Sequence, residues 1–512
     1  MGLKGKYSVL FFVVALFLLS CLTAAKEDPE LMTCKHQCRQ QRQYDEKQKR
    51  FCERQCEDYS KEKRERERRK EGKEEDERWD INPRWDPQED RREMGRRSRG
   101  YDEEGEGERE NPYVFNEDEF ETKFQNQFGR ERVLPKFSRV SKHLKGIENF
   151  RVEIFETKPM TFMLPKHCDA DAFFFVANGR GTITLVSPDN RESFNIQRGH
   201  IMKVAAGTNV YLVNSDDNER LILVKLIQPV SNPGKFESFF GAGGRNPESF
   251  FNALSPEIVE ALFNVRRDRL EKFFRKQDQG IVKKASREQI RALSQKSEEG
   301  AWPFGGAGAR TSNGPFNLFR QRPLHNNEFG KLIEVDSDDF KQLRDLNLRI
   351  TFANITQGGM HTLHYNTRAT KIAVVVKGTG HFQMACPHIA GEQRQRPSRH
   401  QEEEASSVHY EKVSAKLSCG TVFIVPAGHP FVTVASRDEN LEVICFEVNA
   451  EDNEKVALAG NKSVFKQLER EAKELSFEDK AEVVDEFLGK QKEEFFFAGP
   501  RSRQQRGGRS EE

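Results

Sequence analysis

The stretch TRATKIAVVVKGTGHFQMAC (367–386) decides the fold, because an equivalent stretch, DADAFFFVANGRGTITLV (169–186), occurs earlier in the chain. Each reads as an apolar run, a glycine-containing turn and a second apolar run, which is typical of two antiparallel strands. A further matching segment follows each: GHIMKVAAGTNVYLVN (199–214) after the earlier stretch and GTVFIVPAGHPFVTVA (420–435) after the later one. The repetition indicates an internal duplication.

Two blocks of the chain, over about 113–230 and 325–450, carry short apolar strands separated by Gly, Pro, Asn and Asp. This pattern is typical of antiparallel barrels or jelly rolls. The net charge is only +1, from 83 basic and 82 acidic residues, and hydrophobic residues make up 36% of the chain. That fraction is low for a chain that is packed throughout. We therefore expect an all-β fold with helical extensions, in which part of the chain stays unpacked.

Segments with helical spacing follow each β block. After the first, SPEIVEALF (255–263) has Pro256 at the first helical position, and RDRLEKFF and SREQIRALSQ continue the pattern. After the second, SVFKQLEREAKELSFEDKAEVVDEFLG (463–489) gives the matching set, in which we expect Ser476 to begin a further capped helix. Apolar side chains on these helices need partners, which a barrel or a neighbouring subunit would supply. They are Ile258, Leu262, Phe263, Val464, Leu468 and Leu475.

Residues 1–25 are predicted to be a secretory signal peptide. They contain two early lysines, an apolar run from Val9 to Leu19 and small residues that end at Ala25, where we expect cleavage. A membrane anchor is the alternative, but the run is shorter than the ~18 residues that a spanning helix needs. No later run approaches that length, so we expect no membrane partner.

Four cysteines near the beginning of the chain have helical spacing. The sequences CKHQC and CERQC each place two cysteines four residues apart, on one face of a helix. Two antiparallel helices would bring Cys34 opposite Cys56 and Cys38 opposite Cys52, so that two disulfides staple a hairpin over 26–60. A zinc site of four cysteines is the alternative, although zinc pairs usually have tighter spacing.

Two segments have compositions that do not favour a packed structure. Residues 61–110 are mostly Arg, Lys, Glu and Asp, with a few Trp and Pro, and we expect a disordered charged spacer because so little apolar surface is available to bury. Acidic residues interleave with the basic ones throughout, so we expect no nucleic-acid partner. The end of the chain, 496–512, is predicted to be a disordered tail.

The two glycine-rich repeats with trailing helices resemble the bicupins, and specifically the vicilin-type (7S) seed storage globulins. The similarity extends from Asn111 to about Gly489. The segments that carry it include LPKHCDADAFFFVANGRG, FFNALSPEIVEALFNVRRDRLEKFF, GGMHTLHYNTRATKIAVVVKGTG, PAGHPFVTVAS and LAGNKSVFKQLEREAKELSF. The resemblance implies two cupin (jelly-roll β-barrel) domains, over 111–300 and 301–495, each with a helical arm. The cysteine hairpin and the spacer resemble the pro-region of some vicilins.

The resemblance also implies a biological role. Vicilins form homotrimers in which the helical arms of one subunit pack head-to-tail against the next. They travel through the secretory pathway to the seed protein storage vacuole and are degraded at germination as a nutrient reservoir. We therefore expect this chain to be a storage protein.

The metal-binding pattern of catalytic cupins is incomplete in both repeats. In the second, His364 fits the pattern, but Asn366 stands where a second histidine is required. Lys371 and Phe431 stand at the carboxylate and the distal histidine places. A hard divalent or ferrous site needs imidazole and carboxylate ligands together, so we expect no enzyme. The corresponding places of the first repeat hold Pro165, His167, Ala172 and Val210.

A ligand pocket could persist in each barrel without the metal. His364 would then be a packing or pocket residue, and Arg368 or Lys371 would hold a small anion beside it. The pattern therefore predicts a small anionic ligand as the partner of the barrel interior.

A different set of ligands stands near the rim of the second barrel. Cys386 and His388, two apart on a predicted strand, would point the same way, about 7 Å apart. His429 follows the turn Pro426–Gly428, on what we expect to be a neighbouring strand. One cysteine with two histidines favours copper, with zinc as the alternative. The resemblance adds Tyr113, because some vicilins carry copper on such a set with a tyrosine nearby. The competing interpretation is a thiol and a ring that only pack.

Two further predictions concern modification and a rival function. Asn354-Ile-Thr and Asn461-Lys-Ser are acceptor sequences for N-linked glycans. The rival function is defence or binding: the released cysteine hairpin could act as an antimicrobial or protease-inhibiting peptide, or the barrels could carry a metal or a small ligand.

Overall fold

The computed structural model describes residues 35, 49, 53, 111–274, 277, 279–295, 314–389 and 409–500. The chain divides into two units, Met1–Glu103 and Glu104–Glu512, and the three described residues of the first unit are helical. The predicted signal peptide, the disulfides of the hairpin and the charged spacer lie outside the described residues. Within those residues, no helix has the length and the apolar character needed to cross a membrane.

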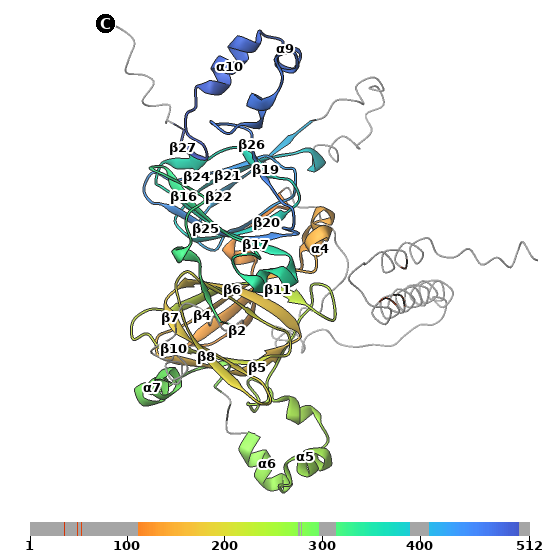
Figure 1. Cartoon of the computed structure of the whole chain (residues 1–512). Helices are drawn as coiled ribbons and strands as arrows, with labels where there is room; N and C mark the ends of the chain where they lie inside the picture. The colour runs from red at the N-terminus through yellow and green to blue at the C-terminus, as the bar shows by residue number, and fades with distance from the viewer. Residues whose placement is uncertain are drawn as a thin grey trace, which may run out of the picture. The chain divides into compact units, whose positions relative to one another are not determined.

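The first barrel consists of two antiparallel sheets that pack face to face (Figure 1). One sheet has the order β14-β9-β6-β11-β4-β3-β2, and the other has β12-β5-β10-β7-β8, with β13 beside β5. The strands of the first sheet are β2 (Glu121–Gln125), β3 (Gly129–Val133), β4 (Arg151–Thr157), β6 (Ala170–Asn178), β9 (His200–Val204), β11 (Leu221–Pro229) and β14 (Phe316–Asn317). Those of the second are β5 (Thr161–Cys168), β7 (Arg180–Val186), β8 (Arg191–Gln197), β10 (Asn209–Asn214), β12 (Ser238–Phe239) and β13 (Val282–Lys284).

The second barrel repeats this arrangement, which confirms the prediction of two jelly-roll barrels. One sheet has the order β1-β23-β20-β25-β17-β16-β15, and the other has β22-β21-β24-β18-β27, with β19 and β26 beside it. The strands of the first sheet are β1 (Val114–Phe115), β15 (His325–Asn327), β16 (Gly330–Val335), β17 (Leu348–Ile355), β20 (Thr370–Lys377), β23 (Val422–Val425) and β25 (Leu441–Val448). Those of the second are β18 (Gly359–His361), β19 (His364–Asn366), β21 (Gly380–Cys386), β22 (Glu411–Leu417), β24 (Phe431–Ala435), β26 (Lys455–Ala457) and β27 (Phe496–Ala498).

A glycine turn links equivalent strands in the two repeats, β6 to β7 and β20 to β21. Gly179 and Gly378 have φ values of 80° and 84°, which L side chains rarely adopt. A Cβ atom on either glycine would also meet a backbone carbonyl oxygen, that of Arg220 or of Asn440. Glycine is therefore required at the point where the chain passes from one sheet to the other.

Each barrel takes a short strand from the part of the chain that flanks the other barrel. Val114 pairs with Phe423, so β1 lies in the second barrel although it precedes the first. Phe316 pairs with Ile201, so β14 lies in the first barrel although it precedes the second. The predicted boundaries at 111 and 301 therefore do not separate the two barrels. Two-residue strands have no pattern of their own, and their partners are set by tertiary contacts.

The two barrels share a hydrophobic core. On β6, Phe173 and Phe175 belong to a cluster that continues into the second barrel, whereas Phe174 and Val176 point into the interior of the first. This alternation follows the period of two along a strand. All seven residues of β4 are buried, because one face lines the barrel and the other lies against the shared core.

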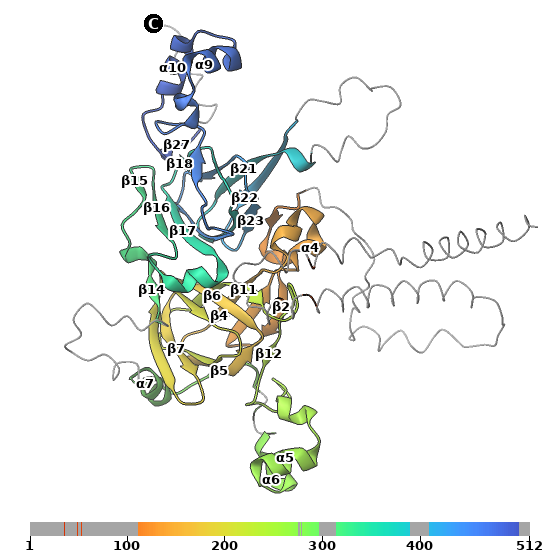
Figure 2. The same ribbon diagram turned by 45° about the vertical axis from the view of Figure 1, so that its right-hand side comes forward.

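Helices follow each barrel as predicted. They are α5 (Pro256–Phe263), α6 (Arg267–Phe274) and α7 (Arg287–Gln295) after the first, and α9 (Arg470–Phe477) and α10 (Ala481–Gly489) after the second. In both views α5 and α6 lie beyond the first barrel, and α9 and α10 beyond the second (Figure 1, Figure 2). The prediction that Ser476 begins a helix is wrong: Ser476 lies in the last turn of α9, and α10 begins after Lys480.

The boundary of the predicted tail at 496 is wrong. Phe496 pairs with His361, so that β27 completes the sheet beside β18. The side chains of Phe496 and Phe497 are 1% and 3% exposed. The apolar run FFF (495–497) is buried against the barrel, which outweighs the polar composition that follows it.

Candidate metal centre

The predicted ligands lie where β21 ends beside β24. Met384 pairs with Phe431, which confirms that the two stretches form neighbouring strands. His388 is not on the strand, however: β21 ends at Cys386, and residues 387–389 form a helical turn. Pro387 has no N–H group and cannot continue the ladder, so the chain leaves the sheet there.

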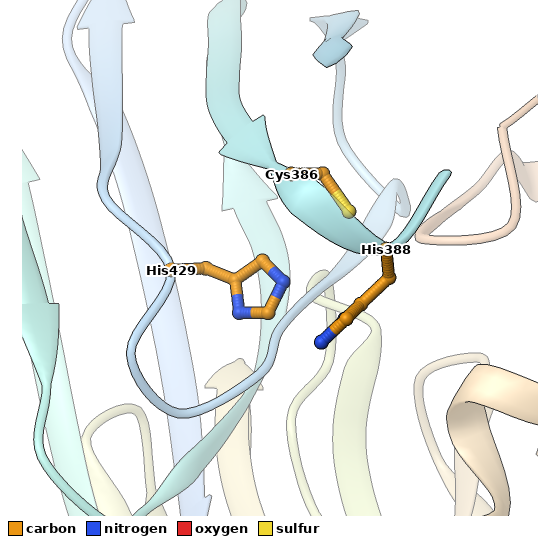
Figure 3. A group of neighbouring side chains, drawn as sticks. All are labelled: Cys386, His388 and His429. Atoms are coloured by element: carbon orange, nitrogen blue, oxygen red, sulfur yellow. The ribbon is translucent and has the colours of Figure 1, made fainter. Parts of the chain in front are cut away.

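The three side chains nevertheless converge (Figure 3). Cys386 Sγ and one ring nitrogen each from His388 and His429 all lie within 4.8 Å of one another. Cys386 and His429 are buried, whereas His388 is exposed. A single ion could contact all three atoms after small side-chain adjustments, since metal–ligand distances for these atoms are about 2.0–2.3 Å.

The hydrogen bonding of His429 leaves the lone pair of one ring nitrogen available to a metal. Its Nδ1 atom lies 3.0 Å from the carbonyl oxygen of Ala427, which can only accept, so Nδ1 carries the proton. The lone pair is then on Nε2, which is buried and has no hydrogen-bond partner among the described residues. Burial lowers the pKa of His429, which favours the neutral ring. In metal-binding histidines, the ring nitrogen that does not bind the metal usually carries a hydrogen and donates it to a carbonyl or carboxylate oxygen.

Tyr113 reaches the same place from the beginning of the described chain. The pairing of β1 with β23 fixes it, and Ile424 N–H donates to its carbonyl across 2.8 Å. The Cys386 thiol donates to Tyr113 Oη across 3.7 Å, inside a fully buried environment. The phenol is therefore beside the sulfur, as the resemblance implied.

One residue of this cluster was not predicted from the sequence. His143 lies on η2 (Lys142–Ile147), and its ring stacks on that of His388 with centroids 5.7 Å apart. A single histidine in SKHLKG has no spacing relation to Cys386 or His429, so no sequence signal pointed to it.

The chemistry of the donor set fits a copper or zinc ion. A thiolate and two neutral imidazoles are ligands that both metals take, whereas magnesium and calcium prefer carboxylate and carbonyl oxygens. The Nε2 atom of His429 has no hydrogen-bond partner among the described residues, and a metal ion would satisfy this buried polar atom, which is otherwise destabilising.

The interior of the second barrel holds a small cavity with mostly apolar walls. Its volume is about 20 Å³, room for about one water molecule, and His361, His364 and Lys371 line it. Both histidines donate from Nδ1 to the carbonyl of Thr362 at 2.9 Å. Burial lowers the pKa of His361 to about 3, so this ring stays neutral.

Two of the three residues predicted for an anion pocket line this cavity, and the third does not. Lys371 Nζ lies 3.4 Å from the Glu447 carboxylate, and His364 is 1% exposed. The side chain of Arg368 is 61% exposed and pairs with Asp452 at 3.5 Å. Arg368 lies in the turn between β19 and β20, from which its side chain extends into solvent.

The first barrel has the larger interior cavity, of about 70 Å³. Lys166 and Lys225 line it with Glu153, between mostly apolar walls. Lys166 pairs with Glu131 at 2.9 Å, and Lys225 pairs with Glu153. Burial, together with the neighbouring Glu131 charge, raises the pKa of Glu153.

The two predicted glycan acceptors have different surroundings. Asn354 is half-buried within β17, and its side chain accepts a hydrogen bond from Asn440 at 3.2 Å. Asn461 is exposed in the turn that precedes α9, and accepts from Lys466 at 3.3 Å. Asn461 is therefore the more accessible acceptor.

The comparisons with known proteins agree with this fold. The sequence matches the Cupin family over residues 141–270 and 316–484. It is 46% identical to the vicilin Jug r 6.0101 of Juglans regia, over all of both chains. The crystal structure of vicilin from Corylus avellana is 48% identical and covers 76% of this chain and 100% of that one, with a TM-score of 0.69.

A second solved structure adds information about ligands. The vicilin from Solanum melongena is 39% identical and covers 77% of this chain and 99% of its own, with a TM-score of 0.70. Its description reports different anionic ligands in structurally similar pockets of that protein. Taken together, the family match, the whole-length identity and the duplicated jelly-roll barrels show that the chain belongs to the cupin family, as a vicilin-type (7S) seed storage globulin.

Proposed function

We propose that this storage globulin holds one copper ion on Cys386, His388 and His429, with Tyr113 beside the thiol. The observation that carries the proposal is the convergence of three soft donor atoms within 4.8 Å, one of them a buried nitrogen without a described partner. Zinc is the competing metal, because it takes the same ligands. A bound ion would tie the end of β21 to the loop before β24, and would stabilise the folded chain by mass action.

Metal analysis of protein purified without chelators tests this proposal. We expect about one copper ion per chain in the wild type and none in Cys386→Ala. Cys419→Ala is the matched control, because Cys419 is an exposed thiol outside the cluster. Zinc in place of copper would correct the metal, and neither metal in the wild type would overturn the site.

We expect the chain to have no catalytic role. In the second barrel, Lys371 stands at the place where catalytic cupins have a carboxylate ligand, and it pairs with Glu447. Phe431 stands where the distal histidine is required, and the centroid of its ring lies 4.4 Å from that of the His364 ring. Copper oxidase or dismutase activity that disappears in Cys386→Ala would contradict this expectation.

A homotrimer is the proposed assembly. Apolar side chains on the helices that follow each barrel are exposed in the single chain, among them Leu262 at 62% and Leu475 at 83%. Exposed apolar clusters of this kind mark protein–protein contacts, and a head-to-tail contact between α5–α6 and α9–α10 would close a ring.

The secretory route to the storage vacuole belongs to the same proposal. The predicted signal peptide of residues 1–25 supports it. Sequencing the beginning of the protein from seed, together with immunolocalisation, tests it: we expect removal of residues 1–25 and labelling of storage vacuoles. The defence role assigned to the cysteine hairpin lies outside the described residues and stays a prediction.

A small carboxylate is the second proposed ligand, and the first barrel suits it better than the second. Lys166 and Lys225 both line its cavity of about 70 Å³, where Glu153 is the one carboxylate among the lining residues, so the lining offers positive charge to a small anion. Titration with sodium acetate in a calorimeter tests this: we expect heat with the wild type and with Lys371→Met, and none with Lys225→Met. Loss of binding only in Lys371→Met would place the anion in the second barrel.

A further inference from the structure

Four rings form a closed circuit beside the Cys386 thiol. The centroid of His143 lies 5.7 Å from that of His388, with the ring planes 11° apart, and 6.5 Å from that of Tyr113, with the planes 30° apart. His429 closes the circuit, at 4.9 Å from His388 and 6.3 Å from Tyr113. Favourable ring pairs have centroids about 4.5–7 Å apart, and each neighbouring pair in the circuit lies within this range.

The backbone that carries His143 is firmly placed. His143 is the second residue of η2, and its N–H donates to Ser141 Oγ across 3.2 Å. Leu144 and Ile147 of the same turn are buried in the core that the two barrels share. The ring is therefore held by a segment that precedes the first barrel's β4, although it faces a residue of the second barrel.

His388 is the ligand that most needs such support. Cys386 and His429 are 0% and 3% exposed, so packing restricts their side chains. His388 is exposed and lies on the helical turn 387–389, outside the ladder of β21. An exposed side chain loses rotamer freedom when it binds an ion, and this loss weakens binding. A ring that is already stacked loses less.

We propose that His143 is a positioning residue of the metal centre, and that its ring, by stacking on His388, holds that imidazole toward the ion shared with Cys386 and His429. The inference rests on the metal site proposed above. With Tyr113, it makes the site a joint product of four segments: the residues before β1, η2, the end of β21 and the loop before β24. The face of His143 acts here, and its nitrogen atoms are not required.

Three variants of the full-length, metal-free protein separate this role from others. His143→Ala removes the stack, His143→Phe keeps a flat ring without nitrogen, and His381→Ala removes an exposed histidine of β21 outside the circuit. Thermal unfolding without metal shows first that each variant is folded. The affinity for Zn²⁺ is then measured by calorimetry and that for Cu²⁺ by the thiolate-to-copper absorption band.

We expect His143→Ala to bind both ions about tenfold more weakly, because partners that orient a ligand typically contribute that much to metal affinity. His143→Phe and His381→Ala should bind as the wild type does. Wild-type affinity in His143→Ala would overturn the proposal. Equal weakening in His143→Phe would overturn it too, since a nitrogen of His143 would then be required.

A metal-free readout distinguishes failure of this inference from failure of the metal site. In crystals of the metal-free protein, we expect one rotamer of His388 in the wild type and in His143→Phe, and several in His143→Ala. One rotamer in all three would overturn the positioning role. Ordered rings in a wild type that binds neither ion would overturn the metal site and leave only the stack.

Discussion

The ring of Phe175, on β6 of the first barrel, packs against the ring of Phe352, on β17 of the second, with centroids 5.9 Å apart. The two side chains are 1% and 4% exposed. They lie in one continuous apolar cluster with residues of both barrels. The barrels therefore depend on the same buried surface, and we expect them to unfold together.

Replacing Phe352 by alanine should lower the free energy of unfolding by about 3–5 kcal/mol, because a large ring is lost from a packed core. Calorimetry should still show one transition. Tyr410→Ala is the control, since Tyr410 is 62% exposed and lies outside the helices proposed for the subunit contact, and its effect should stay within about 0.5 kcal/mol. Two separate transitions, or equal effects of the two variants, would contradict the shared core.

The buried ion pairs of the second barrel predict acid sensitivity. Lys371 and Lys455 lie 3.4 and 3.0 Å from the Glu447 carboxylate. Burial acts to raise the pKa of this carboxyl, but attraction to the two lysines outweighs it and lowers the pKa from 4.5 to about 2. A carboxyl with a lowered folded-state pKa stabilises the fold above its unfolded-state pKa, and this contribution is lost as the pH falls through the folded-state value.

We therefore expect the free energy of unfolding to fall between pH 4.5 and about pH 2, in part through Glu447. Glu447→Gln should lose that part of the pH dependence, and should cost about 3–5 kcal/mol at neutral pH, because buried Lys371 loses its carboxylate partner and buried Lys455 loses one of its two, keeping Glu334. Urea unfolding across this pH range measures both effects. Glu439→Gln, at an exposed position, is the control. An acid response of Glu447→Gln that matches the wild type would contradict the assignment.

The exposed apolar faces of the helices that follow each barrel predict how the subunits contact one another. Leu262→Asp on α5 and Leu475→Asp on α9 should each convert the proposed trimer to smaller species, because a head-to-tail contact needs both faces. Light scattering coupled to size-exclusion chromatography gives the mass. Val230→Asp, at a side chain 61% exposed and outside these helices, should keep the wild-type mass. Unchanged mass in both helix variants would exclude these faces from the contact.

The strand β27 predicts that the end of the described chain contributes to stability. Phe496→Ala should lower the free energy of unfolding by about 3–5 kcal/mol, since this side chain is 1% exposed. Tyr410→Ala, at a side chain 62% exposed, serves as the control in the same denaturant titration. Equal stability of the two variants would mean that β27 adds little to the barrel.

Much of the fold could be predicted because it follows local patterns. The apolar runs around Gly179 and Gly378 have the period of strands, and the glycines mark turns that only glycine fits. The position of His429 beside β21 followed from the order of the repeats. The departure of His388 from the strand also had a signal, Pro387, which the strand interpretation overlooked.

The remaining features depend on contacts that leave no local signal. The pairing of Val114 with Phe423 joins residues that are far apart in the chain through two residues only. The stack of His143 on His388 depends on where η2 meets the second barrel. The burial of Phe496 was hidden by the polar sequence after it. In each case the structure depends on contacts with residues that are distant in the chain, and the local sequence does not reveal these contacts.

The exchange of β1 and β14 has a consequence for how the reserve is digested. A protease that cuts between Gln295 and Gly314 would produce two fragments, and each would still hold a strand in the barrel of the other. The two fragments would stay associated after one cut, and the cleaved protein would remain folded in the seed. We therefore expect amino acids to be released only after further cuts within the barrels.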